Sequence, residues 1–150
     1  RPRIDENGYT ASDEENAKLV SPSFVIASRL GAIHSTSGGL SNLDLDEKLI
    51  VFADHAKNYV EVDDVNDDKK DPAVVYDNWR LPTEAELNII IELQGGDGVN
   101  ADAIDFLLNG QYYMSASGPV YNPKNSDGSS ALDNPMNAKD VAIRCVRDAF

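Results

Sequence analysis

The chain has 150 residues, of which 41% are hydrophobic, and this is enough to form one domain with a hydrophobic core. Its formal net charge of -13 argues against nucleic acid and anionic lipid surfaces as partners, because both would be repelled. No apolar run approaches the roughly 20 residues of a membrane-spanning helix, so we expect no direct membrane insertion. A single cysteine excludes an internal disulfide.

Residues 1–16 are polar and acidic, which predicts a flexible lead-in before a domain at 17–150. The chain begins with Arg1 and shows no signal-peptide pattern. This indicates either that a leader has been removed or that the sequence is a domain of something longer, and the polar lead-in favours the second interpretation.

Two elements are expected in the first half of the chain. A short apolar run at 23–28 is typical of a buried strand. Apolar residues then recur at helical spacing over 45–60, which predicts an amphipathic helix. Asp44 and Glu47 form a capping-box pattern at the start of this helix.

A second helix is specified by the segment that reads W-R-L-P-T-E-A-E-L at 79–87. Thr83 is placed as the N-cap, and Glu86 follows three residues later. Each side chain can then accept a hydrogen bond from a backbone N–H that the helix itself leaves unpaired. We expect this helix over 84–94, because two glycines follow and end it.

The residues before this helix have a structural interpretation. A lone tryptophan in front of a helix is usually part of the core, and we assign Trp79 to that role. The guanidinium of Arg80 is expected to bind carbonyls or a carboxylate and so to hold the corner together.

The second half of the chain changes in character. A short helix is predicted at 101–108, and strands are predicted at 111–117, 119–121 and 141–147. A long polar insert occupies 122–137. Helices early and strands late, without regular alternation, favour an α+β fold over a doubly wound sheet.

The stretch 61–71 holds six acidic residues and two lysines, which predicts an exposed loop. Four of its carboxylates are weak candidates for a calcium site, because calcium prefers oxygen ligands: Asp63, Asp64, Asp67 and Asp68. The stretch lacks the spacing of an EF-hand, and the two lysines follow directly. A solvated loop is therefore the favoured interpretation, and no cofactor is predicted apart from this calcium option.

The best candidate ligand face combines the strand at 111–117 with the polar insert. Aromatic rings can stack on the C–H faces of a sugar, while amide and carboxylate groups pair with its hydroxyls. The candidate residues are Tyr112, Tyr113, Tyr121, Asn122, Asn125 and Asp127. The alternative is an ordinary surface loop rich in turn-forming residues.

Catalytic patterns are scarce, and we predict a non-enzyme. Cys145 lies in the closing strand, where a buried and inert thiol is favoured over a nucleophile. His34 lies in a Ser-rich loop, and His55 is expected on the exposed edge of its helix. No zinc-protease, nucleophile-elbow, Walker or Rossmann motif is present.

The segment at 79–87 and the ending A-I-R-C-V-R-D at 142–148 resemble motifs of formylglycine-generating-enzyme-like and C-type-lectin-like domains. The resemblance implies a small twisted antiparallel sheet flanked by two helices, with long loops on the ligand face. It also implies structural roles for Trp79, Arg80, Thr83, Glu86 and Cys145. The enzymes of this superfamily need thiolates on a ligand-facing loop, and this chain has none there. The calcium triplets of C-type lectins are absent as well.

A closer resemblance covers most of the chain. The stretches S-P-S-F-V-I-A-S-R-L-G at 21–31 and F-A-D-H-A-K-N-Y-V-E at 52–61 join the two motifs above in a series that looks like the C-terminal domain of Bacteroides-type surface proteins associated with fimbriae and adhesion. Relatives often carry A-x-x-C where this chain has Ala53 to Ala56, so a helix-to-strand disulfide is missing here and Cys145 is left free.

This resemblance implies a recognition module displayed at the cell surface, outside the outer membrane. We therefore predict a non-catalytic, extracellular adhesion domain at the end of a larger surface protein. Its expected partners are a glycan or a host or bacterial surface protein, together with other domains of the parent protein. The alternative is a structural domain that caps or anchors a surface assembly and has no ligand of its own.

Overall fold

A computed structural model of the chain describes residues 1–28, 31–33, 39–63, 74–95, 111–122, 132–138 and 140–149. Several predicted features lie outside these residues: the helix at 101–108, His34, Asn125, Asp127, Asp64, Asp67 and Asp68.

The described elements are helices and short strands, which is α+β in general terms. In chain order they are α1 (Glu14–Ala17), β1 (Phe24–Ile26), the 3-10 helix η2 (Leu40–Asn42), α2 (Leu45–Asn58), β2 (Glu61–Asp63), β3 (Val74–Tyr76), α3 (Glu84–Gly95), β4 (Gln111–Ser115), β5 (Gly118–Asn122), the 3-10 helix η3 (Pro135–Asn137), β6 (Val141–Ala142) and β7 (Val146–Asp148). The two long helices begin at the predicted residues because their caps are local. The Asp44 carboxylate accepts from the Glu47 N–H at the start of α2.

The strands form three small sheets within the described part of the chain. β1 pairs with β7 and β2 pairs with β3, both antiparallel. In the third sheet β4 lies between β5, to which it is antiparallel, and β6, to which it is parallel. The β4–β6 ladder therefore differs from the all-antiparallel sheet that the resemblance implies.

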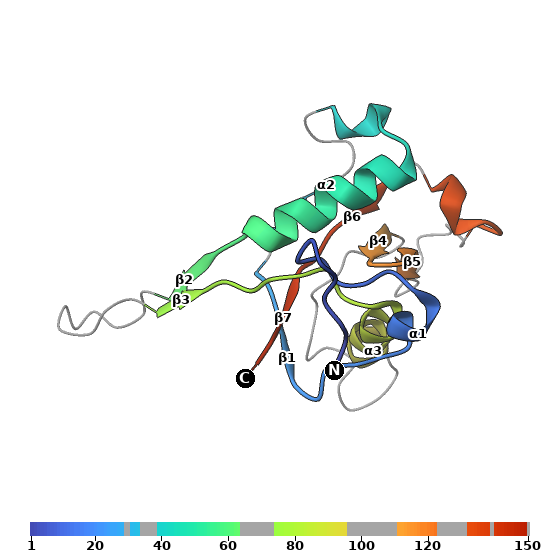
Figure 1. The fold of residues 1–150 in the computed structure, drawn as a ribbon. Helices are drawn as coiled ribbons and strands as arrows, with labels where there is room; N and C mark the ends of the chain where they lie inside the picture. The colour runs from blue at the N-terminus through green and yellow to red at the C-terminus, as the bar shows by residue number, and fades with distance from the viewer. Residues whose placement is uncertain are drawn as a thin grey trace.

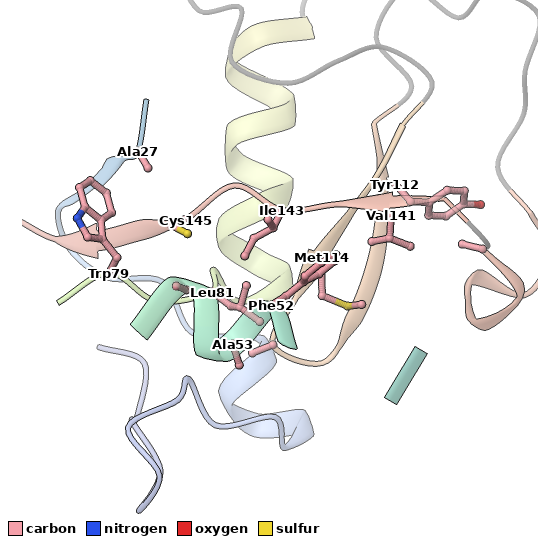
Figure 2. Close-up of a cluster of buried hydrophobic side chains, with 13 residues drawn as sticks. Ala27, Phe52, Ala53, Trp79, Leu81, Tyr112, Met114, Val141, Ile143 and Cys145 are labelled. Atoms are coloured by element: carbon pink, nitrogen blue, oxygen red, sulfur yellow. The ribbon is translucent and has the colours of Figure 1, made fainter. Parts of the chain in front are cut away.

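The central strands separate two hydrophobic clusters. Along the closing segment Val141, Ile143 and Cys145 join the larger cluster, which packs on α2 through Phe52 and contains Trp79 (Figure 2). Their neighbours Ala142 and Val146 join the smaller cluster, which packs on Leu87 and Ile90 of α3. This alternation follows from the two-residue repeat of extended chain. It places α2 and α3 on opposite sides of the central strands, as Figure 1 shows.

The predicted strand at 141–147 is interrupted between β6 and β7, because the chain changes partners there. The backbone N–H of Ile143 donates to the carbonyl of Ile33 (2.9 Å), and the carbonyl of Cys145 accepts from Ala27 (2.9 Å). The guanidinium of Arg144 also donates twice to the carbonyl of Ala27. The segment thus leaves the β4 ladder and joins β1 without a continuous ladder between them.

The corner before α3 is a network of buried charges. The Arg80 guanidinium donates to both oxygens of Glu86, at 2.7 and 2.8 Å, and to Asp148 at 3.0 Å. Both bonds of the expected capping box are present, from the Thr83 N–H to Glu86 (2.9 Å) and from the Glu86 N–H to the Thr83 hydroxyl (3.1 Å). The Ser21 N–H is a further donor to Glu86 (3.0 Å). Both charges of the central pair are therefore buried with partners.

Residues 1–16 are packed on the domain and do not form the flexible lead-in that their composition suggests. The Thr10 hydroxyl donates to the carbonyl of Leu81 (2.6 Å), and the Lys57 ammonium of α2 donates to the carbonyl of Asn7 (2.7 Å). Tyr9 also packs against the larger cluster, and Ala11 is buried. The polar and acidic composition did not indicate these contacts, because a few residues make them.

The acidic stretch after α2 begins as a strand and not as a loop. Glu61–Asp63 forms β2, which pairs with β3 in an antiparallel ribbon. In Figure 1 this ribbon extends away from the body of the domain at the end of α2.

Candidate functional site: an apolar groove beside strand β1

A hollow of about 620 Å³ lies between β1 and α3. Its lining comes from two continuous stretches of chain: Val20, Ser21, Pro22, Ser23, Phe24, Val25 and Ile26 on one side, and Ile89, Ile90 and Leu93 on the other. Most of these side chains are aliphatic or aromatic. The groove therefore suits apolar groups, which is the usual character of a binding cleft.

Packing explains how the groove is formed. Phe24 and Ile26 are half-buried and pack against the smaller cluster, which includes Ile90 of α3. Two other lining residues retain large exposed fractions, 40% for Val25 and 43% for Leu93. Apolar surface left exposed beside a hollow is available to a ligand.

One wall of the groove is a strand with an open edge. Ser23 and Ala27 bond to Ala149 and Cys145 across the β1–β7 pair. By the alternation of antiparallel bonding, the backbone groups of Phe24 therefore point away from β7, as do those of Ile26 two residues later. Among the described residues no third strand pairs with this edge.

The open edge ends at Ser28. The backbone N–H of Ser28 donates to the carboxylate of Glu61 (2.7 Å), so a side chain takes this donor. Burial alone would raise the pKa of Glu61, but the bonds that Ser28 donates lower it below its ordinary value. The edge that a ligand can pair with is thus limited to β1 itself.

The predicted aromatic face is largely part of the core. Tyr112 and Tyr113 are buried on opposite sides of β4, and Asn122 is buried as well. Tyr121 is half-buried, and its ring lies 5.0 Å from that of Tyr112 at 50°. The Tyr112 hydroxyl accepts a hydrogen bond from the backbone of Leu132. β4 is covered on both faces, so its tyrosines do not form the exposed platform that we expected.

The predicted metal site falls mostly outside the described residues. Of the four candidate carboxylate residues, Asp63 is the one within the described chain, and it is the last residue of β2. In the part of the chain that the structure describes, no group of three His, Cys, Asp or Glu side chains is placed to hold a metal ion.

The candidate reactive side chains have structural partners. Cys145 is buried, and burial raises the pKa of its thiol to about 12, which leaves it protonated at neutral pH. His55 is half-buried and not on an exposed edge, since its Nε2 lies 2.8 Å from the carbonyl oxygen of Gly31. Its ring also stacks on that of Tyr59.

Sequence reasoning missed the groove, although α3 carried a signal for it. Ile89, Ile90 and Ile91 are consecutive, and three consecutive helix residues cannot all face one core. Of these three isoleucines, only Ile90 is fully buried. Ile91 is half-buried against the same cluster as Ile90, whereas Ile89 and Leu93 face a second surface and line the groove.

None of the described helices has the length and apolar character needed to cross a membrane.

No family model matches the sequence, and no solved structure matches it significantly. Curated relatives include two sequences from Porphyromonas gingivalis, each named major fimbrium tip subunit FimD. Each is 32% identical to this chain over 115 residues, which cover 71% of the chain. The chain spans only 16% of the length of these relatives.

Proposed function

We propose that this chain is a non-catalytic domain of a fimbria-associated surface protein, and that it docks a polypeptide segment in the groove between β1 and α3. The scaffold is C-type-lectin-like, and the domain acts in adhesion or assembly outside the outer membrane. The similarity to a fimbrium tip subunit supports the surface role. The groove carries the docking role, because it combines an open strand edge with a hollow that is mostly apolar.

The chemistry of the groove favours a polypeptide over a sugar. Sugars need several planar polar groups around their hydroxyls, whereas only two lining side chains are polar, those of Ser21 and Ser23. The Ser21 hydroxyl already donates to the carbonyl of Ser23 (3.0 Å). An extended peptide, in contrast, can pair its backbone with β1 and place apolar side chains against Ile89 and Leu93.

A phage-displayed library of random linear peptides, selected on the immobilised chain, tests this function. We expect enriched peptides to carry apolar residues at alternate positions, because alternate side chains of an added strand face the same way. Leu93→Lys should abolish their binding. Its matched control is Ile50→Lys, which changes another exposed apolar residue on a helix, remote from the groove lining.

Two outcomes oppose the groove as the docking site. One is that no peptide is enriched, which leaves a structural capping domain without a ligand. The other is that enriched peptides bind Leu93→Lys as well as they bind the unmodified chain.

A glycan array separates protein recognition from sugar recognition. With the purified chain we expect no bound glycan, in calcium or in chelator. A glycan bound in both conditions would shift the proposed function to a metal-free lectin. Binding that disappears in chelator would instead point to the acidic stretch after α2 as a calcium site.

A further inference from the structure

The ribbon of β2 and β3 is a second surface that the groove does not include. Its cross-strand pairs are Glu61 with Tyr76, Val62 with Val75, and Asp63 with Val74. Within the described residues it is a two-stranded sheet without a third strand, and it projects from the end of α2 (Figure 1). A lone two-stranded ribbon is only marginally stable in water, so it gains from any surface that covers it.

One face of this ribbon is fixed to the domain. The Glu61 carboxylate accepts from the Ser28 N–H (2.7 Å) and from the Tyr59 hydroxyl (3.0 Å). The guanidinium of Arg147 lies 4.3 Å from the ring centroid of Tyr76, the cross-strand partner of Glu61. Directly paired residues share a face of the sheet, so this face is the one that contacts the body.

The opposite face is apolar and open to solvent. Val62 and Val75 form the next cross-strand pair, so they point away from the anchored face. Their exposed fractions are 57% and 56%, and Val60, two residues before Val62, is also exposed. Val74 is exposed as well, but it pairs with Asp63 and therefore lies on the face of Glu61 and Tyr76. We call β2 and β3 with these four valines the valine ribbon. A cluster of exposed β-branched residues on a projecting ribbon is typical of an interaction surface.

Charge decides which partner suits this surface. The whole chain carries a formal net charge of -13. A second copy would bring the same net negative charge to the contact, and like charges oppose association. A partner with basic residues around an apolar centre suits both the apolar face of the ribbon and the negative charge of the chain.

We propose that the valine ribbon docks on a second protein through an extended apolar segment of that protein that is flanked by lysine or arginine. This surface is separate from the groove, because the two share no residue. A domain with both surfaces holds two polypeptides at once. The proposal therefore goes beyond the groove and does not depend on it.

Nuclear magnetic resonance with a short peptide of alternating lysine and valine tests the proposal. We expect the peptide to shift amide resonances of residues 60–62 and 74–76, and to do so less at high salt. A peptide in which glutamate replaces lysine should shift none of them. The double variant Val62→Thr and Val75→Thr should weaken binding of the lysine peptide about tenfold, since it removes apolar contact while keeping β-branched side chains.

The groove supplies the matched control. Leu93→Lys should leave the ribbon shifts unchanged, so failure of the groove and failure of the ribbon give different results. Because the shifts are mapped on the unmodified chain, the test does not depend on the stability of any variant. Peptide-induced shifts confined to 24–26 and 89–93, or equal binding of the lysine and glutamate peptides, would overturn the proposal.

Sedimentation velocity tests the choice of a different protein as the occupant. We expect the chain alone to be monomeric at low salt, where repulsion between two negatively charged copies is strongest. A dimer that Val62→Thr and Val75→Thr together dissociate would make a second copy the occupant and would contradict the proposal.

Discussion

The corner around Arg80 and the valine ribbon are neighbours in sequence but differ in which kind of side chain is buried and which is exposed to solvent. At the corner, charged groups are buried, and Glu86 accepts from Arg80, Thr83 and Ser21. At the ribbon, apolar side chains are exposed, with 57% of Val62 open to solvent. Polar groups with internal partners hold a fold together, whereas apolar groups without cover are available to another molecule. The comparison separates a region that serves stability from one that serves binding.

The largest effect is expected from removing the cation at the corner. Arg80→Met leaves the Glu86 carboxylate buried without its bidentate partner, and breaking a buried ion pair in this way costs about 3 to 5 kcal/mol. Urea denaturation of the variant measures the free energy of unfolding. If the free energy of unfolding falls by no more than it does for an ordinary surface substitution, the corner does not stabilise the fold.

The pH dependence of the corner follows from Glu86. Burial alone would raise the pKa of this carboxyl, but the bonds and charge of Arg80 and the backbone donors of Thr83 and Ser21 lower it below 4.5. A carboxyl whose pKa is lower in the folded chain than in the unfolded chain stabilises the fold at any pH above its unfolded-state pKa. This stabilisation is lost as the pH falls through the folded-state pKa. The contribution should therefore be complete at neutral pH and decline below about 4.5.

Comparison with Glu86→Gln isolates this contribution. In a chain of charge -13, acid also relieves general repulsion between carboxylates, and this effect is common to both proteins. We expect the difference in unfolding free energy between the two proteins to shrink as the pH falls from 7 through the acidic range. Urea titrations at several pH values measure it. A difference that does not change with pH would show that the charge of Glu86 does not stabilise the corner.

A smaller effect is expected at the helix cap. Thr83→Ala leaves the Glu86 N–H without its hydroxyl acceptor and should destabilise the chain by about 1 to 2 kcal/mol. Thr83→Ser keeps the hydroxyl and is the matched control. Thermal unfolding of both variants checks the prediction, and equal losses would assign the effect to the lost methyl group and not to the cap.

The smallest effect on stability is expected at the ribbon. Val62→Thr and Val75→Thr are exposed and keep their branching, so each should change the unfolding free energy by no more than about 0.5 kcal/mol. The same urea assay applies. A loss as large as that of Thr83→Ala would mean that these valines support the fold itself, and the contrast between ribbon and corner would then disappear.

Local patterns predicted the parts of the molecule that local interactions form. The starts of α2 and α3 were readable from Asp44 and Thr83, because an N-cap involves residues only three positions apart. The burial of Trp79 was also predicted, but its position was not, because Trp79 packs in the larger cluster with α2 and not beneath α3. The C-type-lectin-like scaffold stays a prediction from motifs.

Candidate ligand residues were harder to predict, because exposure depends on distant parts of the chain. Tyr112 and Tyr113 have the residue types of a sugar platform, yet β4 is covered by one cluster on each face. The groove depends on β1 and α3, which are separated by some 60 residues of sequence. Hydrophobic pattern indicates that a residue avoids water, but it does not identify the element that covers it.

The sequence by itself determined the α+β character of the described chain, the two capped helices and the acidic net charge. Only the tertiary structure decided which apolar residues remain exposed, where the closing segment changes from β4 to β1, and which edge of β1 stays open. Caps and periodicity act over a few residues, whereas burial is set by contacts between segments far apart in the chain. For this reason the candidate docking surfaces emerged from the packing and not from any motif.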